Sequence, residues 1–104
     1  MSTSNEHRKE AERLILDVKA QLEPLPASET RDKLVNECAA LAVAIVAFHM
    51  EGIRFRMFNV DRLLSRGGIS VPPAAEAAFA QARQHLEAAG FHTRSHQAPP
   101  SSGS

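Results

Sequence analysis

The chain has 104 residues, 43% hydrophobic and 23% charged, and its formal net charge at pH 7 is zero. This balance argues against a surface dominated by nucleic-acid or anionic-membrane binding, although it is compatible with a local basic patch. The single cysteine, Cys38, excludes an intrachain disulfide and a CxxC metal pair, so we expect a reducing, cytoplasmic setting. The polar start of the chain does not resemble a signal peptide, and the longest apolar run, residues 39–48, is too short for a membrane span, which needs about 20 residues.

The first predicted helix covers residues 5–22. Its apolar residues recur at spacings of three and four, which is typical of a helix with one buried face, and they are Ala11, Leu14, Ile15, Val18 and Leu22. Pro24 and Pro26 end this helix, because a proline cannot continue the hydrogen bonding. Ser28 or Thr30 is then placed to cap the next helix.

A second helix is predicted over residues 29–65, straight through Gly52. Two rows of apolar residues keep helical spacing across that glycine. The first row is Leu34, Cys38, Leu41, Ile45, Phe48, Gly52 and Phe55, and the second row is Val43, Val46, Met50, Ile53, Met57, Val60 and Leu64. A β-strand over residues 53–58 explains fewer of these positions. An interior glycine costs about 1 kcal/mol relative to alanine, so the competing arrangement breaks the helix at Gly52 and folds a compact four-helix monomer.

A third helix is predicted over residues 73–89, after the two glycines at 67 and 68 have ended the second. Gly90 and Phe91 match a Schellman ending, in which Phe91 folds back on the last turn. Residues 92–104 have the composition of a disordered polar tail. We therefore expect one all-α domain over residues 1–91, a bundle of three helices with a long central helix.

Such a central helix implies assembly. It would be about 54 Å long at 1.5 Å per residue, which exceeds the dimensions of a compact domain of this size. The two shorter helices would leave parts of both apolar rows uncovered, and long exposed apolar stripes mark interfaces. We predict a homodimer that completes a four-helix-like bundle, with an interface formed by Leu41, Ile45, Phe48, Ile53 and Met57.

Three sets of residues could carry chemistry, and each has a simpler interpretation. His49 and Glu51 would point apart on a helix, so they do not form an acid–base pair. His92 and His96 have the spacing of a metal-binding pair but lie in the polar tail. Cys38 belongs to an apolar row, where a thiol is usually a small filler. The sequence also has no Walker, GxSxG or HExxH motif, so we predict no enzyme, no catalytic residue, no metal site and no cofactor.

Arginines gather in the second half of the predicted central helix. Arg62 and Arg66 are one turn apart and could together hold an anion or the acidic strip of a partner. Aromatic and arginine side chains are favoured anchors of interfaces, so we predict a partner-binding surface of Phe55, Phe58, Arg54, Arg62 and Arg66. The first hypothesis is therefore a non-catalytic helical protein–protein interaction module, acting as a homodimer in the role of an adaptor, small regulator or assembly subunit.

Residues 59–89 suggest an alternative, because a helix, a glycine-containing turn and a second capped helix match the outline of a helix-turn-helix. Its second helix offers Glu76, Gln81 and Arg83, which are few groups suited to base edges or phosphates. A small DNA-binding transcriptional regulator is thus the second hypothesis, and nucleic acid is less favoured as a partner than protein. A metal- or ligand-binding bundle that uses His49 is the third.

Overall fold

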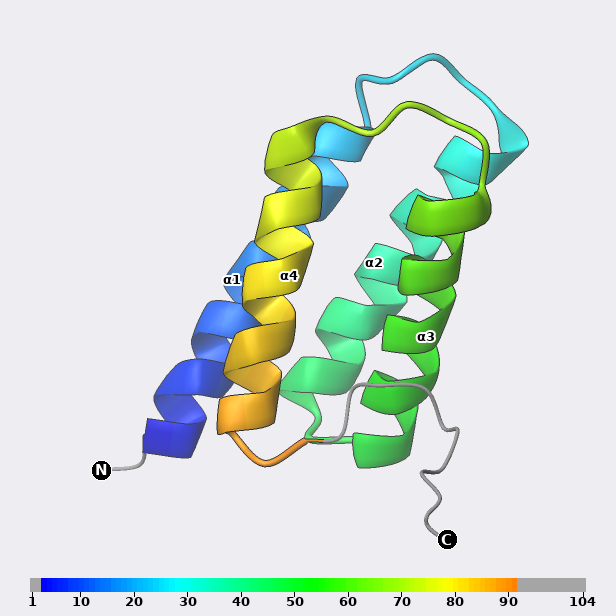
Figure 1. Ribbon diagram of the computed structural model, residues 1–104. Helices are drawn as coiled ribbons and strands as arrows, with labels where there is room; N and C mark the ends of the chain where they lie inside the picture. The colour runs from blue at the N-terminus through cyan, green and yellow to red at the C-terminus, as the bar shows by residue number, and fades with distance from the viewer. Residues whose placement is uncertain (1–2, 92–104) are drawn as a thin grey trace, which may run out of the picture.

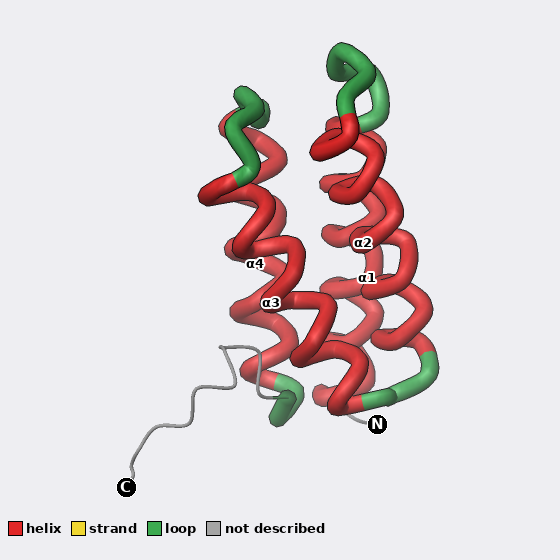
Figure 2. The backbone as a smooth tube through the Cα atoms, turned by 90° about the vertical axis from the view of Figure 1, so that its right-hand side faces the viewer, coloured by secondary structure: helices red, strands yellow, loops and turns green. Residues whose placement is uncertain are grey.

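The computed structural model describes residues 3–91, which form four α-helices and no strand (Figure 1). The helices are α1 (Thr3–Leu22), α2 (Glu29–Val46), α3 (Met50–Arg66) and α4 (Pro73–Ala88). They run alternately up and down, and the views in Figures 1 and 2 together place them at the four corners of a bundle. α1 packs against α4 and α2, and α2 packs against α3, whereas α3 and α4 contact each other little. The prediction of an all-α chain is confirmed, with four helices in place of three.

α1 forms where the apolar spacing predicted it. The side chains it buries are the predicted ones, Ala11, Leu14, Ile15, Val18 and Leu22. α2 begins at the predicted cap, because the Ser28 hydroxyl accepts a hydrogen bond from the Arg31 N–H at 3.0 Å. None of the helices within residues 3–91 combines the length and apolar character needed to cross a membrane. The predicted polar tail, residues 92–104, lies outside the described residues.

The predicted continuous helix over residues 29–65 is wrong, because the chain breaks between α2 and α3. The Phe48 N–H donates to the Ile45 carbonyl at 3.2 Å, and the His49 N–H donates to the Ala44 carbonyl at 3.0 Å. These are the two hydrogen bonds of a Schellman ending. Phe48 has the left-handed φ of 57° that this ending requires, so a phenylalanine occupies a position that glycine usually takes.

His49 is the N-cap residue of α3. Its Nδ1 accepts a hydrogen bond from the Gly52 N–H at 2.8 Å, which satisfies one of the unpaired donors of the first turn. A Cβ at Gly52 would lie 2.7 Å from that Nδ1. Gly52 therefore leaves room for the cap inside α3, and the break lies at Phe48 rather than at the glycine.

The break decides which parts of the two apolar rows are buried. Because α3 folds back along α2, the core takes Leu34, Cys38, Leu41 and Ile45 from the first row and Ile53, Met57 and Val60 from the second. Leu64 of the second row is partly buried. The large apolar side chains in the other half of each row are 45–68% exposed, and they are Phe48, Phe55, Val43, Val46 and Met50. One chain thus covers half of each row by itself.

This arrangement relocates the residues predicted for a dimer interface. Leu41, Ile45, Ile53 and Met57 are fully buried within one chain, and only Phe48 is exposed, at 55%. A dimer through these residues requires an uncovered central helix, which the break removes. A homodimer therefore stays a prediction, and in this conformation the four buried side chains cannot form its contacts.

α4 ends as the sequence predicted. The Phe91 N–H donates to the Leu86 carbonyl at 2.9 Å, the Gly90 N–H donates to the Glu87 carbonyl at 3.0 Å, and Gly90 has a φ of 96°. These contacts are those of a Schellman motif. Phe91 is buried beneath the end of the helix, so the structure confirms this ending.

We expect Cys38 to be unreactive in the folded protein. Its side chain is fully buried, and burial, followed by the neighbouring Glu37 carboxylate, raises the pKa of the thiol to about 12. The thiolate is the reactive form, so at pH 8 labelling by a thiol reagent should be about 100-fold slower, or more, than in denatured protein. Labelling rates measured with and without denaturant test this, and similar rates in both would contradict it.

The same pKa gives a direction for stability. The folded thiol has a pKa raised above its value in the unfolded chain, so the neutral thiol favours the folded state. The contribution of the neutral Cys38 thiol to the free energy of unfolding should be fully present below about pH 9. It should decline as the pH rises toward 12.

Candidate functional site

The candidate site lies on the side of α3 that points away from the core. α3 buries Ile53 and Val60, and a helix turns by about 100° per residue, which places Phe55, Phe58 and Arg62 on the opposite side. Phe55 is 57% exposed and Phe58 is partly buried. With Arg66, one turn further along, these residues are called the α3 surface: Phe55, Phe58, Arg62 and Arg66.

Each aromatic ring of this surface has a guanidinium over it. The Cζ of Arg56 is 5.1 Å from the ring centroid of Phe55, and the Cζ of Arg62 is 5.6 Å from the ring centroid of Phe58. Both distances are within the range of cation–π attraction. The surface therefore presents aromatic and cationic groups side by side, the combination that is enriched among residues contributing most to protein interfaces.

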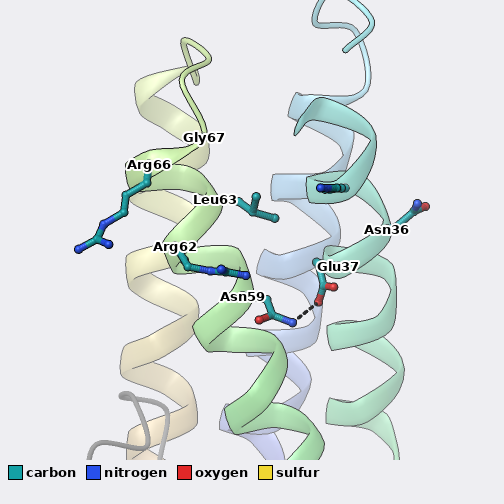
Figure 3. Close-up of a pocket in the computed structure, with 8 residues that line it drawn as sticks. Asn36, Glu37, Asn59, Arg62, Leu63, Arg66 and Gly67 are labelled. Atoms are coloured by element: carbon teal, nitrogen blue, oxygen red, sulfur yellow. Dashed lines mark hydrogen bonds between the residues drawn. The ribbon is translucent and has the colours of Figure 1, made fainter. Parts of the chain in front are cut away.

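A polar cleft of about 650 Å³ lies beside this surface, between α2 and α3. In Figure 3, Arg62 extends toward Asn59 and Glu37, whereas Arg66 points away from them. The cleft thus opens next to the cationic end of the α3 surface. Its lining consists of Lys33, Asn36, Glu37, Asn59, Arg62, Leu63, Arg66 and Gly67.

The carboxylate in this cleft already has partners. Arg56 donates to both Glu37 oxygens at 3.1 Å, and the Asn59 side chain donates to one of them at 3.2 Å. Asn59 and Arg56 thereby tie α3 to α2. Because Glu37 is engaged in this way, much of its charge is already balanced within the molecule.

The arginines of α3 differ in whether their charge is balanced. Arg54 donates to both Glu51 oxygens, at 2.9 and 3.2 Å, and Arg56 is paired with Glu37. Within residues 3–91, neither Arg62 nor Arg66 has a carboxylate at ion-pair distance. Of the predicted partner-binding residues, Arg62 and Arg66 are therefore the cations available to an external anion, and Arg54 is already engaged.

The histidines have structural partners where the structure describes them. His49 caps α3, and the Nδ1 atoms of His7 on α1 and His85 on α4 are 2.8 Å apart, in a hydrogen bond between residues 78 positions apart in sequence. Because of that separation, the pair could not be recognised from local spacing. No group of three or more His, Cys, Asp or Glu side chains in the described part of the chain could hold a metal ion. His92 and His96 lie outside that part.

The segment proposed as a helix-turn-helix has a different geometry. α3 and α4 lie antiparallel in Figure 1, whereas the helices of that motif cross at about 90–120°. Arg83, one of the side chains offered to DNA, is 9% exposed and lies 3.7 Å from Asp61 of α3. Glu76 and Gln81 are exposed. The arrangement therefore does not favour DNA binding, which stays an untested alternative.

Comparison of the chain with protein-family models, with curated proteins and with solved structures found no match. The site is thus defined by the chain's own residues. Among those described, the α3 surface combines an exposed aromatic ring, two arginines without an acidic partner and an adjacent cleft.

Proposed function

We propose that the protein is a non-catalytic interaction module, an adaptor, small regulator or assembly subunit, that binds an acidic segment of a partner protein through the α3 surface. The observation that carries the proposal is that Arg62 and Arg66 lack an acidic partner within residues 3–91, about two and three turns along the helix from an exposed Phe55. The buried thiol of Cys38 is consistent with the reducing, cytoplasmic setting expected from the sequence.

The chemistry of the surface favours a partner segment that carries both carboxylates and apolar side chains. A guanidinium binds a carboxylate through two parallel hydrogen bonds, so Arg62 and Arg66 can each take one acidic side chain. Phe55 offers apolar area that only an apolar side chain would cover favourably. Because the residues are on one helix, their relative positions are set before the partner arrives, which lowers the entropy lost on binding.

Selection from a displayed peptide library tests the proposal. Peptides retained by the wild-type protein, and not by the Arg62→Glu/Arg66→Glu variant, should be rich in Asp and Glu and contain apolar residues. Phe55→Ala should lower the affinity for the selected peptides by about tenfold or more. The affinity of the wild type for them should fall as salt is added. NMR shift changes caused by a selected peptide should map to residues 55–66.

Arg13→Glu is the matched control, because Arg13 is an exposed arginine on α1, far from α3 in sequence, and its side chain is 63% exposed. It makes the charge change of one of the two substitutions in the Arg62→Glu/Arg66→Glu variant, and it should leave peptide affinity within about twofold. Peptides without acidic enrichment, or shift changes that map away from α3, would overturn the proposal. Salt-sensitive binding to duplex DNA that is lost on Arg62→Ala/Arg66→Ala would favour the regulator hypothesis instead.

A further inference from the structure

The second half of α2 is apolar on every side. Residues 38–48 read CAALAVAIVAF and contain no charged or hydrogen-bonding side chain apart from the thiol of Cys38. A helix that is hydrophobic all round is normally buried on all sides. In this chain the core side of α2 is buried, as expected, through Cys38, Leu41, Ala42 and Ile45.

The opposite side of the same helix faces solvent. Val43 is 68% exposed and Val46 is 51% exposed. Together with their neighbours on this side they are called the α2 strip, which consists of Asn36, Ala39, Ala40, Val43, Val46 and Ala47. The strip contains no charged residue, in contrast to the outward side of α1, where Lys9, Arg13 and Asp17 are exposed.

Exposed large apolar side chains are unevenly distributed over the four helices. The described residues include six large apolar side chains that are exposed, and none of them belongs to α4. Two are in the strip, and the others lie on α1, at the turn between α2 and α3, and on α3; the six are Leu16, Val43, Val46, Phe48, Met50 and Phe55. An exposed apolar helix face that carries no charge is typical of an interface with another macromolecule.

We propose that the α2 strip is covered by a second copy of this chain, with the two α2 helices antiparallel and a two-fold axis near Val43. In a two-fold symmetric contact the same patch of both copies meets, so any charge on the axis would meet a like charge. The strip has none. In an antiparallel pair the two helix dipoles also oppose each other, which is favourable.

From residue 39 to residue 47, the order of large and small side chains along the strip fits its own reverse. With the axis at Val43, residues whose numbers sum to 86 face each other. Val46 of one copy then faces Ala40 of the other, and Ala47 faces Ala39. A larger side chain meets a small one, and two alanines meet where the backbones approach, which is the kind of interlocking that lets helices pack about 8–10 Å apart. An unrelated partner would need this same pattern, whereas a second copy supplies it automatically.

The proposal moves the homodimer predicted from the sequence to a different set of residues. It does not depend on the α3 surface, because the strip and that surface lie on different helices. Peptide binding at α3 and self-association through α2 can therefore succeed or fail separately.

Light scattering of tag-free protein over a range of concentrations measures the mass. The wild type should reach twice the 11.3 kDa of one chain. Val43→Glu should raise the dimer dissociation constant by about 30-fold or more, because it buries two like charges opposite each other. Ala77→Glu, which adds the same charge at an exposed position of α4, should leave the dimer unchanged. Circular dichroism should show equal helicity in all three proteins.

Cross-linking locates the axis. Val43→Cys should form an interchain disulfide under mild oxidation, because cysteines beside a two-fold axis can reach the required Cα separation of about 4.4–6.8 Å. Ala77→Cys should not, and the buried native Cys38 should not compete. A wild type that stays at 11.3 kDa at every concentration would overturn the proposal. A dimer that survives Val43→Glu would show that its interface lies elsewhere, which overturns it equally.

Discussion

Replacing Ile45 with alanine should lower the free energy of unfolding by about 2–5 kcal/mol, as large-to-small substitutions in tightly packed cores do. Ile45 is fully buried where α2 meets its neighbours. The loss combines the transfer free energy of the deleted methyl groups with the cavity left behind. Because small domains are stable by only about 5–15 kcal/mol in total, the variant should unfold at much lower denaturant concentration.

Leu16→Ala is the control for this experiment, since Leu16 is 44% exposed on α1. Leu16→Ala should lower the free energy of unfolding by less than about 1 kcal/mol. Urea denaturation followed by circular dichroism measures both. Equal losses at the two positions would contradict a core closed within one chain around Ile45.

The order of stability among substitutions at His49 should reveal how the chain passes from α2 to α3. His49→Ala should lower the free energy of unfolding by about 0.5–2 kcal/mol, because alanine cannot accept the hydrogen bond from the Gly52 N–H. His49→Asp should match or exceed the wild type, since aspartate is a preferred cap and its charge is favourable at the start of a helix.

A continuous helix gives the opposite order. Alanine has the highest helix propensity and aspartate one of the lowest, so in a helix running through position 49 the alanine variant would be the more stable of the two. Denaturation midpoints of the wild type and both variants decide between the arrangements. An alanine variant that is more stable than the aspartate variant would rule out the cap.

Much of the fold follows from the spacing of apolar residues. α1 and α4 appear at the predicted positions, and so do the Ser28 cap and the ending at Gly90. These elements obey local rules that act within a few residues. The buried members of the two apolar rows have the predicted helical spacing within α2 and within α3, whereas the predicted continuation of the rows from one helix to the other was wrong.

The break between α2 and α3 could not be predicted in the same way. Glycine is the residue expected where φ is positive, and Gly52 is the only glycine between residues 1 and 66. The chain instead places Phe48 in that conformation, at a cost of about 1–2 kcal/mol. Packing of Ile53, Met57 and Val60 into the core of the same chain offsets this cost, and such a contact between distant residues is not visible in local spacing.

The candidate site was predicted in part. The positions of Phe55, Phe58, Arg62 and Arg66 on one side of a helix follow from spacing alone. Which arginine keeps an unbalanced charge does not, because the pairing of Arg56 depends on a carboxylate 19 residues away, on another helix. The difference between Arg56 and Arg62 as binding groups thus needed the folded arrangement.

The contacts among the four helices form an open series, from α4 through α1 and α2 to α3, because α3 and α4 touch so little. α3 is consequently anchored mainly by α2, and it should be among the first elements to separate in local unfolding. The helix that carries the proposed binding surface is then also the least firmly held. A partner bound to α3 would stabilise that helix selectively. Binding would then be detectable as an increase in local stability at one edge of the bundle.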